Sequence, residues 1–142
     1  AKNHLKSDHV MIMNGDSFID LNFIDLYNFH LSRGALITVV GAKAQSNSDV
    51  GSITCDKDFR ITRFEERPTI LSQNYINAGI YIFKRSVFDT LLHRKKFSIE
   101  KDFFPNIKKH GFYIFRSNAK LYDIGTPERL QLFASYIRTF NE

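Results

Sequence analysis

Continuous apolar runs alternate with polar stretches along the chain, and the first of these runs ends in an acidic turn. Residues 10–13, VMIM, lead directly into residues 14–17, NGDS. A continuous apolar run bounded by turn residues is typical of a strand buried on both faces of an α/β sheet. Ligands collect beyond the carboxyl ends of such strands, where Asp16 would stand. The same four residues are common turn formers, so this stretch alone leaves a binding role and a plain turn equally open.

The next segment predicts a helix followed by a second buried strand. Residues 21–34, LNFIDLYNFHLSRG, have the helical period, with Asn22 as a suitable N-cap and Gly34 as a stop. The apolar run ALITVVGAK, residues 35–43, follows as a strand. Strand, helix and strand in this order form a βαβ unit, which predicts a parallel pairing of the two strands.

The middle of the chain changes to short strand-like segments separated by polar turns. This pattern favours short or antiparallel strands, with a hairpin turn at residues 56–59. The three segments are VGSITCD at 50–56, RITRFEERP at 60–68 and YINAGIYIF at 75–83.

The last third predicts two helices, two strands and a closing helix. Ser98 and Thr126 are candidate N-caps, and Pro105 should kink or divide the helix that contains it. The closing helix should present Leu130, Phe133, Ile137 and Phe140 on one apolar face. The segments in order are 85–95, 98–111, 112–117, 120–125 and 126–142.

Composition narrows the class of protein. A chain of 142 residues, 43% hydrophobic and 25% charged, has the size and composition of one ordinary globular domain. Its apolar runs are too short for a membrane span, we expect no signal peptide, and its single cysteine suits a reducing cytoplasm. We therefore expect one cytoplasmic α/β domain over residues 1–142, with a mixed, mainly parallel sheet flanked by helices.

The net charge of +5 suggests an anionic partner without naming it. The basic residues form short clusters at 93–96 and 108–109, which are typical of a solvated surface. Nucleic-acid binding would require a basic stripe interleaved with exposed aromatic residues, whereas the phenylalanines here lie within apolar segments. We expect no nucleic-acid partner.

Histidine, cysteine and serine give no catalytic pattern. The five histidines show no pair at metal-ligand spacing, so we expect surface or capping roles for them. Cys55 has no sequence context of a nucleophile, and Ser17 lacks the G-x-S-x-G context of a hydrolase.

A second aspartate repeats the arrangement of the first. Asp123 ends the apolar-flanked segment LYDIGT, just before a glycine and a helix cap. Asp16 and Asp123 could meet over one divalent cation, since Mg²⁺ takes one or two protein carboxylates and fills its other positions with phosphate oxygens and water. Such a site serves phosphoryl or nucleotidyl transfer. The spacing alone favours the simpler interpretation of two unrelated turn aspartates.

The order of five segments is similar to that of the sugar-phosphate nucleotidyltransferases, which make nucleotide sugars from a nucleoside triphosphate and a sugar 1-phosphate. The chain most resembles the bacterial guanylyltransferases that act on heptose 1-phosphate or mannose 1-phosphate, which implies a role in surface polysaccharide synthesis. The resemblance covers nearly the whole chain. The segments are MNGDSFID, VGSITCDKDFRITRFEERP, YINAGIYIF, FSIEKDFFP and YDIGTPERL.

The resemblance implies a role for each of eight residues. Asp16 and Asp123 correspond to the two aspartates that bind Mg²⁺, and Arg67 stands where the family usually has a lysine on the sugar phosphate. Carboxylates and amides bind sugar hydroxyls, a guanidinium can hold phosphate with two hydrogen bonds, and glycine lets the backbone approach a ligand. The residues that correspond to the sugar pocket are Gly51, Glu66, Asn77, Gly79 and Glu100.

The glycine-rich loop that holds the triphosphate in this family has no counterpart in the sequence. We therefore expect the chain to correspond to the second part of the fold, to be inactive by itself, and to self-associate as a homo-oligomer. Two other functions stay open: a metal-dependent glycosyltransferase, and a non-catalytic module that binds a sugar phosphate. Release of pyrophosphate would exclude the first, and a glycine-rich loop encoded upstream would exclude the second.

Overall fold

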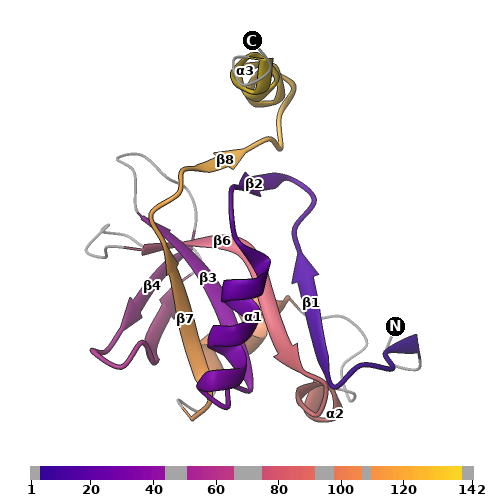
Figure 1. The fold of residues 1–142 in the computed structure, drawn as a ribbon, viewed down its shortest axis with the longest axis vertical. Helices are drawn as coiled ribbons and strands as arrows, with labels where there is room; N and C mark the ends of the chain where they lie inside the picture. Colours follow the sequence, from indigo (N-terminus) through magenta and orange to yellow (C-terminus); the bar gives the residue numbers. More distant parts are fainter. Residues whose placement is uncertain (1–3, 44–50, 66–74, 92–97, 107–109, 139–142) are drawn as a thin grey trace.

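The computed structural model describes residues 4–43, 51–65, 75–91, 98–106 and 110–138, which form a mixed sheet with helices on its faces (Figure 1). The predicted α/β class is confirmed. In these ranges no helix is both long enough and apolar enough to cross a membrane.

The strands are β1 (His9–Met13), β2 (Ser17–Ile19), β3 (Ile37–Lys43), β4 (Ser52–Cys55), β5 (Ile61–Glu65), β6 (Tyr75–Lys84), β7 (Phe112–Ser117) and β8 (Leu121–Asp123). The helices are α1 (Phe23–Ser32), α2 (Val87–Leu91), the π-helix η2 (Ile99–Phe103), the 3₁₀-helix η3 (Phe104–Asn106) and α3 (Pro127–Arg138).

Strand β6 is the centre of the large sheet. The strand order is β5-β4-β6-β3-β7, and β1 also pairs with β6. β3 lies along one edge of β6, whereas the other edge is divided between β4, at Tyr75 and Ile76, and β1, from Ile80 to Lys84. β2 and β8 form a separate two-stranded sheet.

The directions of the strands correct two expectations from the sequence. β1 and β3 point the same way, but they do not pair, because β6 lies between them and is antiparallel to both. Among the described strands only β3 and β7 pair in parallel, so the sheet is mixed but not mainly parallel. The βαβ pattern fixes the relative direction of its two strands, and it does not fix whether a later strand enters between them.

β1 is an edge strand within the described part of the chain, where β6 is its only partner. Ile12 packs against the core, while Met11 and Met13 are 39% and 52% exposed. The prediction of a strand buried on both faces is therefore wrong for β1. An apolar run is compatible with either position, because apolar side chains also occur on exposed surface.

The predicted signals for the start and end of α1 are confirmed. Oδ1 of Asn22 accepts hydrogen bonds from the backbone N–H groups of Ile24 and Asp25, at 3.0 and 3.3 Å. Gly34 follows the helix with a φ of +54°, a left-handed conformation that suits glycine. Leu26 and His30 point inward from α1 and are fully buried.

The helix predicted at 98–111 is divided, as Pro105 indicated. Ser98 Oγ accepts a hydrogen bond from the N–H of Lys101 at 3.2 Å and caps η2, and Pro105 lies in the 3₁₀ turn η3 that follows. Residues 107–109 of the predicted helix lie outside the described ranges. α3 begins as predicted, with Thr126 Oγ1 accepting from the N–H of Arg129 at 3.3 Å.

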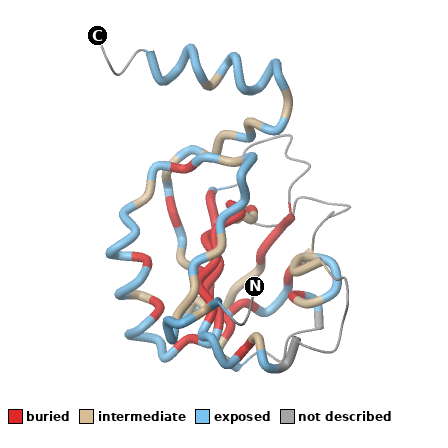
Figure 2. The backbone as a smooth tube through the Cα atoms, turned by 90° about the vertical axis from the view of Figure 1, so that its right-hand side faces the viewer, coloured by how far each residue is buried: buried red, intermediate tan, exposed pale blue. Residues whose placement is uncertain are grey.

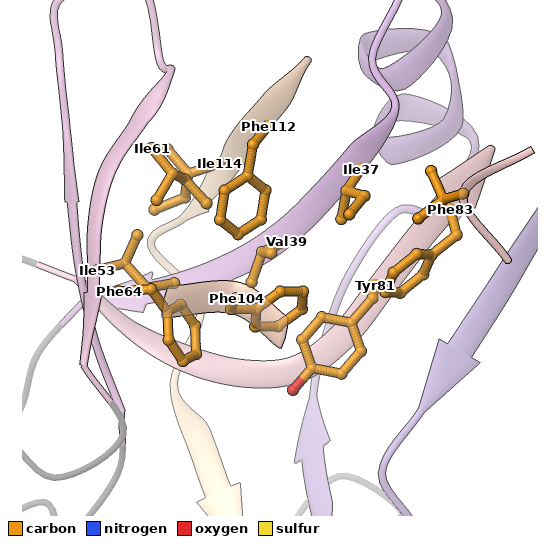
Figure 3. Packing of buried hydrophobic residues seen from close by; sticks show 11 residues of the cluster. Ile37, Val39, Ile53, Ile61, Phe64, Tyr81, Phe83, Phe104, Phe112 and Ile114 are labelled. Atoms are coloured by element: carbon orange, nitrogen blue, oxygen red, sulfur yellow. The ribbon is translucent and has the colours of Figure 1, made fainter. Parts of the chain in front are cut away.

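The core has one apolar cluster on each face of the sheet, and the buried residues gather on the central strands (Figure 2). Residues of β6 alternate between the two clusters, as a period of two requires. Tyr81 and Phe83 belong to the aromatic cluster on one face, together with Phe64, Phe104 and Phe112 (Figure 3). The other cluster contains Leu26 of α1, Val40 and Ala42 of β3, and Ile76, Ala78, Ile80 and Ile82 of β6.

Helix α3 stands apart from this core (Figures 1 and 2). Phe133 packs against Phe18 at a ring distance of 4.9 Å, but Leu130 and Ile137 are 49% and 37% exposed. Only part of the predicted apolar face is therefore covered by the described residues. Phe140 lies outside the described ranges.

Candidate functional site

The turn that follows β1 is fixed against a bulge of β6. The N–H of Asn14 donates to the carbonyl of Gly79 at 2.8 Å, and Ser17 Oγ donates to the carbonyl of Ala78 at 3.2 Å. Gly79 has a φ of +73°, and a methyl group on its Cα would lie 2.9 Å from both Asn14 Nδ2 and Ser17 Oγ. A side chain at Gly79 would therefore be strained and would displace the turn that carries Asp16.

The bulge also determines where Asn77 lies. Val39 is opposite Tyr81 and Gly41 is opposite Asn77, so β6 passes through more residues than β3 between these two pairs. Bulges bend a strand and redirect its side chains, and they are common next to functional sites. Here the bulge separates Asn77 from the regular, apolar half of β6.

Asp16 and Asp123 lie side by side through the pairing of β2 with β8. Ser17 is the register partner of Asp123, and the N–H of Ile124 donates to the carbonyl of Asp16 at 2.8 Å. A methyl group on Gly125 would lie 3.2 Å from Oδ1 of Asp123 and 3.8 Å from Oδ2 of Asp16. The two carboxylates therefore face one location, which was the sequence-based expectation for this pair.

The surroundings of Asp123 show what a cation would have to displace. Oδ1 accepts a hydrogen bond from the N–H of Gly125 at 2.8 Å, and Oδ2 forms an ion pair with Arg129. The described residues contain no group of three or more side chains placed to hold a metal ion. Two exposed carboxylates suit Mg²⁺, which keeps several waters and binds through one or two protein carboxylates. Asp16 and Asp123 could hold such an ion if Arg129 moved away.

A hydrogen-bonded group of residues from three segments lies beside this pair. Asn77 Nδ2 donates to Tyr81 Oη, and Tyr81 Oη donates to Glu100 Oε1, both at 2.7 Å. The N–H of Gly79 donates to Asn77 Oδ1 at 3.1 Å, and the N–H of Asn77 donates to the carbonyl of Gly51 at 2.7 Å. The structure thus brings together four of the residues that the sequence resemblance implies for the sugar pocket.

Tyr81 is the member that sequence reasoning missed, because it lies in an apolar strand segment and is not among the residues for which the resemblance implies a role. It follows Asn77 by four residues on the same strand, which was the available signal. Burial is the largest cause that raises the pKa of Tyr81 well above its usual value of 10, and the negative charges of Glu100 and Asp16 raise it further. The turn that carries Asp16 is hydrogen-bonded to Gly79 and Ala78, next to Asn77, so the phenol and the carboxylate pair belong to one region. Tyr81 is therefore neutral at physiological pH and available as a donor.

Glu66 and Arg67, the other two residues implied for the sugar side, lie outside the described ranges. Their roles stay predictions from the sequence resemblance.

A second polar group, on the α1 side of the sheet, corrects the expectation that all histidines lie on the surface or in caps. His30 is fully buried, with Nε2 3.0 Å from His9 Nδ1 and Nδ1 2.8 Å from Thr38 Oγ1. Burial and the neighbouring His9 lower the pKa of His30 to about 4. His30 follows the buried Leu26 by one helical turn, and this spacing was the signal for an inward position.

A cavity of about 470 Å³ lies beside His9, at the opposite end of β1 from Asp16. It contains none of the residues that the sequence predicts for a site. Its two cationic side chains are balanced by two carboxylates, and Arg85 pairs with Asp8 at 3.6 Å. The lining residues are Asp8, His9, Lys84, Arg85, Ser86 and Asp89.

The sequence is similar to that of several mannose-1-phosphate guanylyltransferases. It is 36% identical over 133 residues to the mannose-1-phosphate guanyltransferase of Debaryomyces hansenii, a match that covers 90% of this chain and 36% of the relative. It is 29% identical over 127 residues to the mannose-1-phosphate guanylyltransferase of Mycobacterium tuberculosis, covering 87% of this chain and 35% of that protein. The chain thus spans about a third of the length of these relatives.

Solved structures show the same fold. The crystal structure of HddC from Yersinia pseudotuberculosis superposes with a TM-score of 0.81 at 24% identity, over 96% of this chain and 58% of HddC. The HddC complex with GMP-PN gives a TM-score of 0.78 at 25% identity, over 96% of this chain and 60% of that one. Residues 1–138 match the family described as nucleotidyl transferase, and the chain therefore belongs to the nucleotidyl transferase family.

Proposed function

We propose that the full-length protein transfers a nucleotidyl group from a nucleoside triphosphate, GTP in the first instance, to a sugar 1-phosphate. An oxygen of the sugar phosphate attacks the α-phosphorus, the bond from that phosphorus to the bridging oxygen of the β-phosphate breaks, and pyrophosphate leaves with the electron pair. The products are a nucleotide sugar and pyrophosphate. The relatives are named mannose-1-phosphate guanyltransferases, which supports guanine as the base and mannose 1-phosphate as the sugar phosphate.

One observation carries this proposal: two carboxylates from distant segments face one point beside a polar group suited to sugar hydroxyls. Asp16 and Asp123 approach the same position above Gly125. The turn that carries Asp16 is hydrogen-bonded to Gly79 and Ala78, beside the group in which Tyr81 bonds to Asn77 and Glu100. A plain pair of turn aspartates would not require this neighbourhood.

Asp16 and Asp123 would hold Mg²⁺, and Arg129 would have to release Asp123 for that purpose. When bound, the ion would neutralise negative charge on the phosphates and orient them. Asn77 and Glu100 would bind hydroxyl groups of the sugar. The backbone at Gly51 and Gly79 would approach the sugar closely.

The remaining parts of the proposal rest on the sequence resemblance. Glu66 would bind sugar hydroxyls and Arg67 the sugar phosphate. The nucleotide sugar would be made in the cytoplasm and used for surface polysaccharide synthesis. Self-association through the open edge of β1 also stays a prediction, which a mass measurement in solution would test.

The test is a pyrophosphate-release assay on the full-length protein with a panel of nucleoside triphosphates and sugar 1-phosphates. We expect turnover with GTP and mannose or heptose 1-phosphate. Asp16→Asn and Asp123→Asn should each lower kcat by about a hundredfold or more, because each removes a charge needed to organise the phosphates. Asp58→Asn, in the exposed hairpin between β4 and β5, is the matched control and should keep the normal rate.

The outcomes separate the alternatives. A normal rate in both site variants would show that the two aspartates only form turns. Sugar transfer from a nucleotide sugar without pyrophosphate release would indicate a glycosyltransferase. Sugar 1-phosphate binding by a full-length protein that has no turnover would indicate a binding module.

A further inference from the structure

The phenol of Tyr81 has an unusual position at the border between core and site. Its ring is buried, with 1% of the residue exposed, and packs at 5.3 Å from the ring of Phe104 and 6.3 Å from that of Phe83. Figure 3 shows its oxygen at the margin of the aromatic cluster, pointing away from Phe83. The ring therefore anchors the residue in the core, while the hydroxyl group reaches the polar side chains of the site.

The hydrogen bonds around Tyr81 run in one direction. The N–H of Gly79 donates to Asn77 Oδ1, which leaves Asn77 Nδ2 to donate to the phenol oxygen. The phenol then donates its single proton to Glu100 Oε1. A reversed Asn77 amide would place two donors or two acceptors against each other, so the chain of bonds fixes the orientation of Asn77.

This arrangement leaves a defined set of groups for a ligand. Asn77 keeps one amide hydrogen, and Glu100 keeps its second oxygen, so a donor and an acceptor stand on either side of one phenol. The two side chains come from different elements, the strand β6 and the short π-helix η2. Within the described ranges, Tyr81 is the hydrogen-bond partner that the structure gives Glu100.

We propose that Tyr81 is a positioning residue that holds Asn77 and Glu100 at the spacing required to bind adjacent hydroxyl groups of the sugar. This inference rests on the proposed function and deepens it. Tyr81 acts through its two partners and determines affinity for the polyhydroxyl part of the substrate, while the phosphates and the nucleotide are bound elsewhere. Packing alone would not require the hydroxyl group, since a phenylalanine ring fills the same space in the core.

The experiment compares Tyr81→Phe with Tyr113→Phe in the full-length protein. Both variants remove one hydroxyl group from a buried ring, and the hydroxyl of Tyr113 contacts Arg60 at 3.4 Å, away from the site. We expect Tyr81→Phe to raise KM for mannose 1-phosphate roughly tenfold and to leave KM for GTP and kcat nearly unchanged, because a lost hydrogen bond to a charged group has about this effect. Tyr113→Phe should change none of the three constants. Calorimetric titration with mannose 1-phosphate should show the same loss of affinity in Tyr81→Phe.

Three results would overturn the inference, and they differ from one another. An unchanged KM for mannose 1-phosphate in Tyr81→Phe would show that the phenol positions nothing. An equal rise of both KM values, together with a lower melting temperature than that of Tyr113→Phe, would show a purely structural role. A wild-type protein that neither turns over nor binds mannose 1-phosphate or heptose 1-phosphate would remove the proposed function itself, and the inference with it.

Discussion

Two regions of the molecule bury a polar ring between two hydrogen-bond partners. Tyr81 lies between Asn77 and Glu100, and His30 lies between His9 and Thr38. Both residues are almost completely inaccessible to solvent. In the Tyr81 group the end members Asn77 and Glu100 each retain a free polar atom, whereas in the His30 group one end is the buried hydroxyl of Thr38.

This difference distinguishes the Tyr81 group, which belongs to the candidate site, from the His30 group, which connects elements of the fold. A buried polar group needs a partner in either case, because leaving it without one is costly. The His30 group uses this requirement to connect β1, α1 and β3. The Tyr81 group uses it to hold Asn77 and Glu100, the two side chains that we propose bind the sugar. Burial and hydrogen bonding are therefore alike in the two regions, and the difference lies in the end groups: both end members of the Tyr81 group are partly exposed, whereas in the His30 group only His9 is.

The largest change in the free energy of unfolding should come from a substitution of Gly79 in the site region. Gly79→Ala is expected to lower the free energy of unfolding by roughly 2 to 4 kcal/mol, because it combines a positive φ with a collision against the turn of Asn14 and Ser17. Gly34→Ala is the matched control, with a positive φ of +54° and no atom within 4 Å of the added methyl group. It should cost about 1 kcal/mol in urea unfolding. Equal losses in the two variants would show that the turn does not constrain Gly79.

The next largest change in stability should come from the His30 region, and it depends on pH. The unfolded chain binds a proton at its histidines below about pH 6.5, whereas folded His30 binds one only near its pKa of about 4. Stability should therefore fall as the pH is lowered through this window, with His30 contributing a loss of about 2 kcal/mol between about pH 7 and pH 5. The measurement is urea unfolding against pH.

His30→Gln isolates this contribution from that of other groups. The variant should be less stable at neutral pH and should show a shallower decline with falling pH. His110→Gln, which changes an exposed histidine, should keep the wild-type slope. The same slope in all three proteins would mean that His30 gains its proton as readily when folded as when unfolded.

A smaller effect should follow from removing the inner partner of His30. Thr38→Val keeps the shape of the side chain and leaves His30 Nδ1 without its hydrogen bond, which should cost about 1 to 2 kcal/mol in thermal or urea unfolding. Thr62→Val is the control, because Thr62 is exposed and should change stability by less than about 0.5 kcal/mol. No loss in Thr38→Val would indicate that His30 finds another partner there.

The smallest change in stability between about pH 7 and pH 9 should come from ionisation of Tyr81. Because its pKa is raised in the folded protein, Tyr81 stabilises the fold below the usual tyrosine pKa of 10 and loses this contribution only as the pH rises above that value. We expect no Tyr81-dependent change between about pH 7 and pH 9. Tyr81→Phe should lessen the decline in stability at higher pH, and an identical alkaline decline in both proteins would contradict the raised pKa.

Local signals in the sequence predicted much of the fold correctly. Asn22, Ser98 and Thr126 cap helices as expected, and Pro105 divides its helix, because caps and proline act on neighbouring backbone groups. The position of β6 between β1 and β3 could not be predicted in this way. It depends on contacts between segments far apart in the sequence, which the local pattern does not record.

The candidate site shows the same division. The order of the segments identified Asp16, Asp123, Asn77 and Glu100 as candidates, and the structure brings these residues into one region. Tyr81 was missed because its ring has the burial of a core residue and only its hydroxyl group belongs to the site. Hydrophobic periodicity reports where a side chain is buried, and it does not report where its single polar atom points.

The central position of β6 has a consequence for synthesis on the ribosome. Chains are made from the N-terminus, so β1 leaves the ribosome well before β6, the only strand with which it pairs in the described structure. A nascent chain that stops before Tyr75 carries β1 and β3 without the strand that joins them. Translation of β6 is therefore the step at which β1 and β3 can first be joined in the way that the described strands pair.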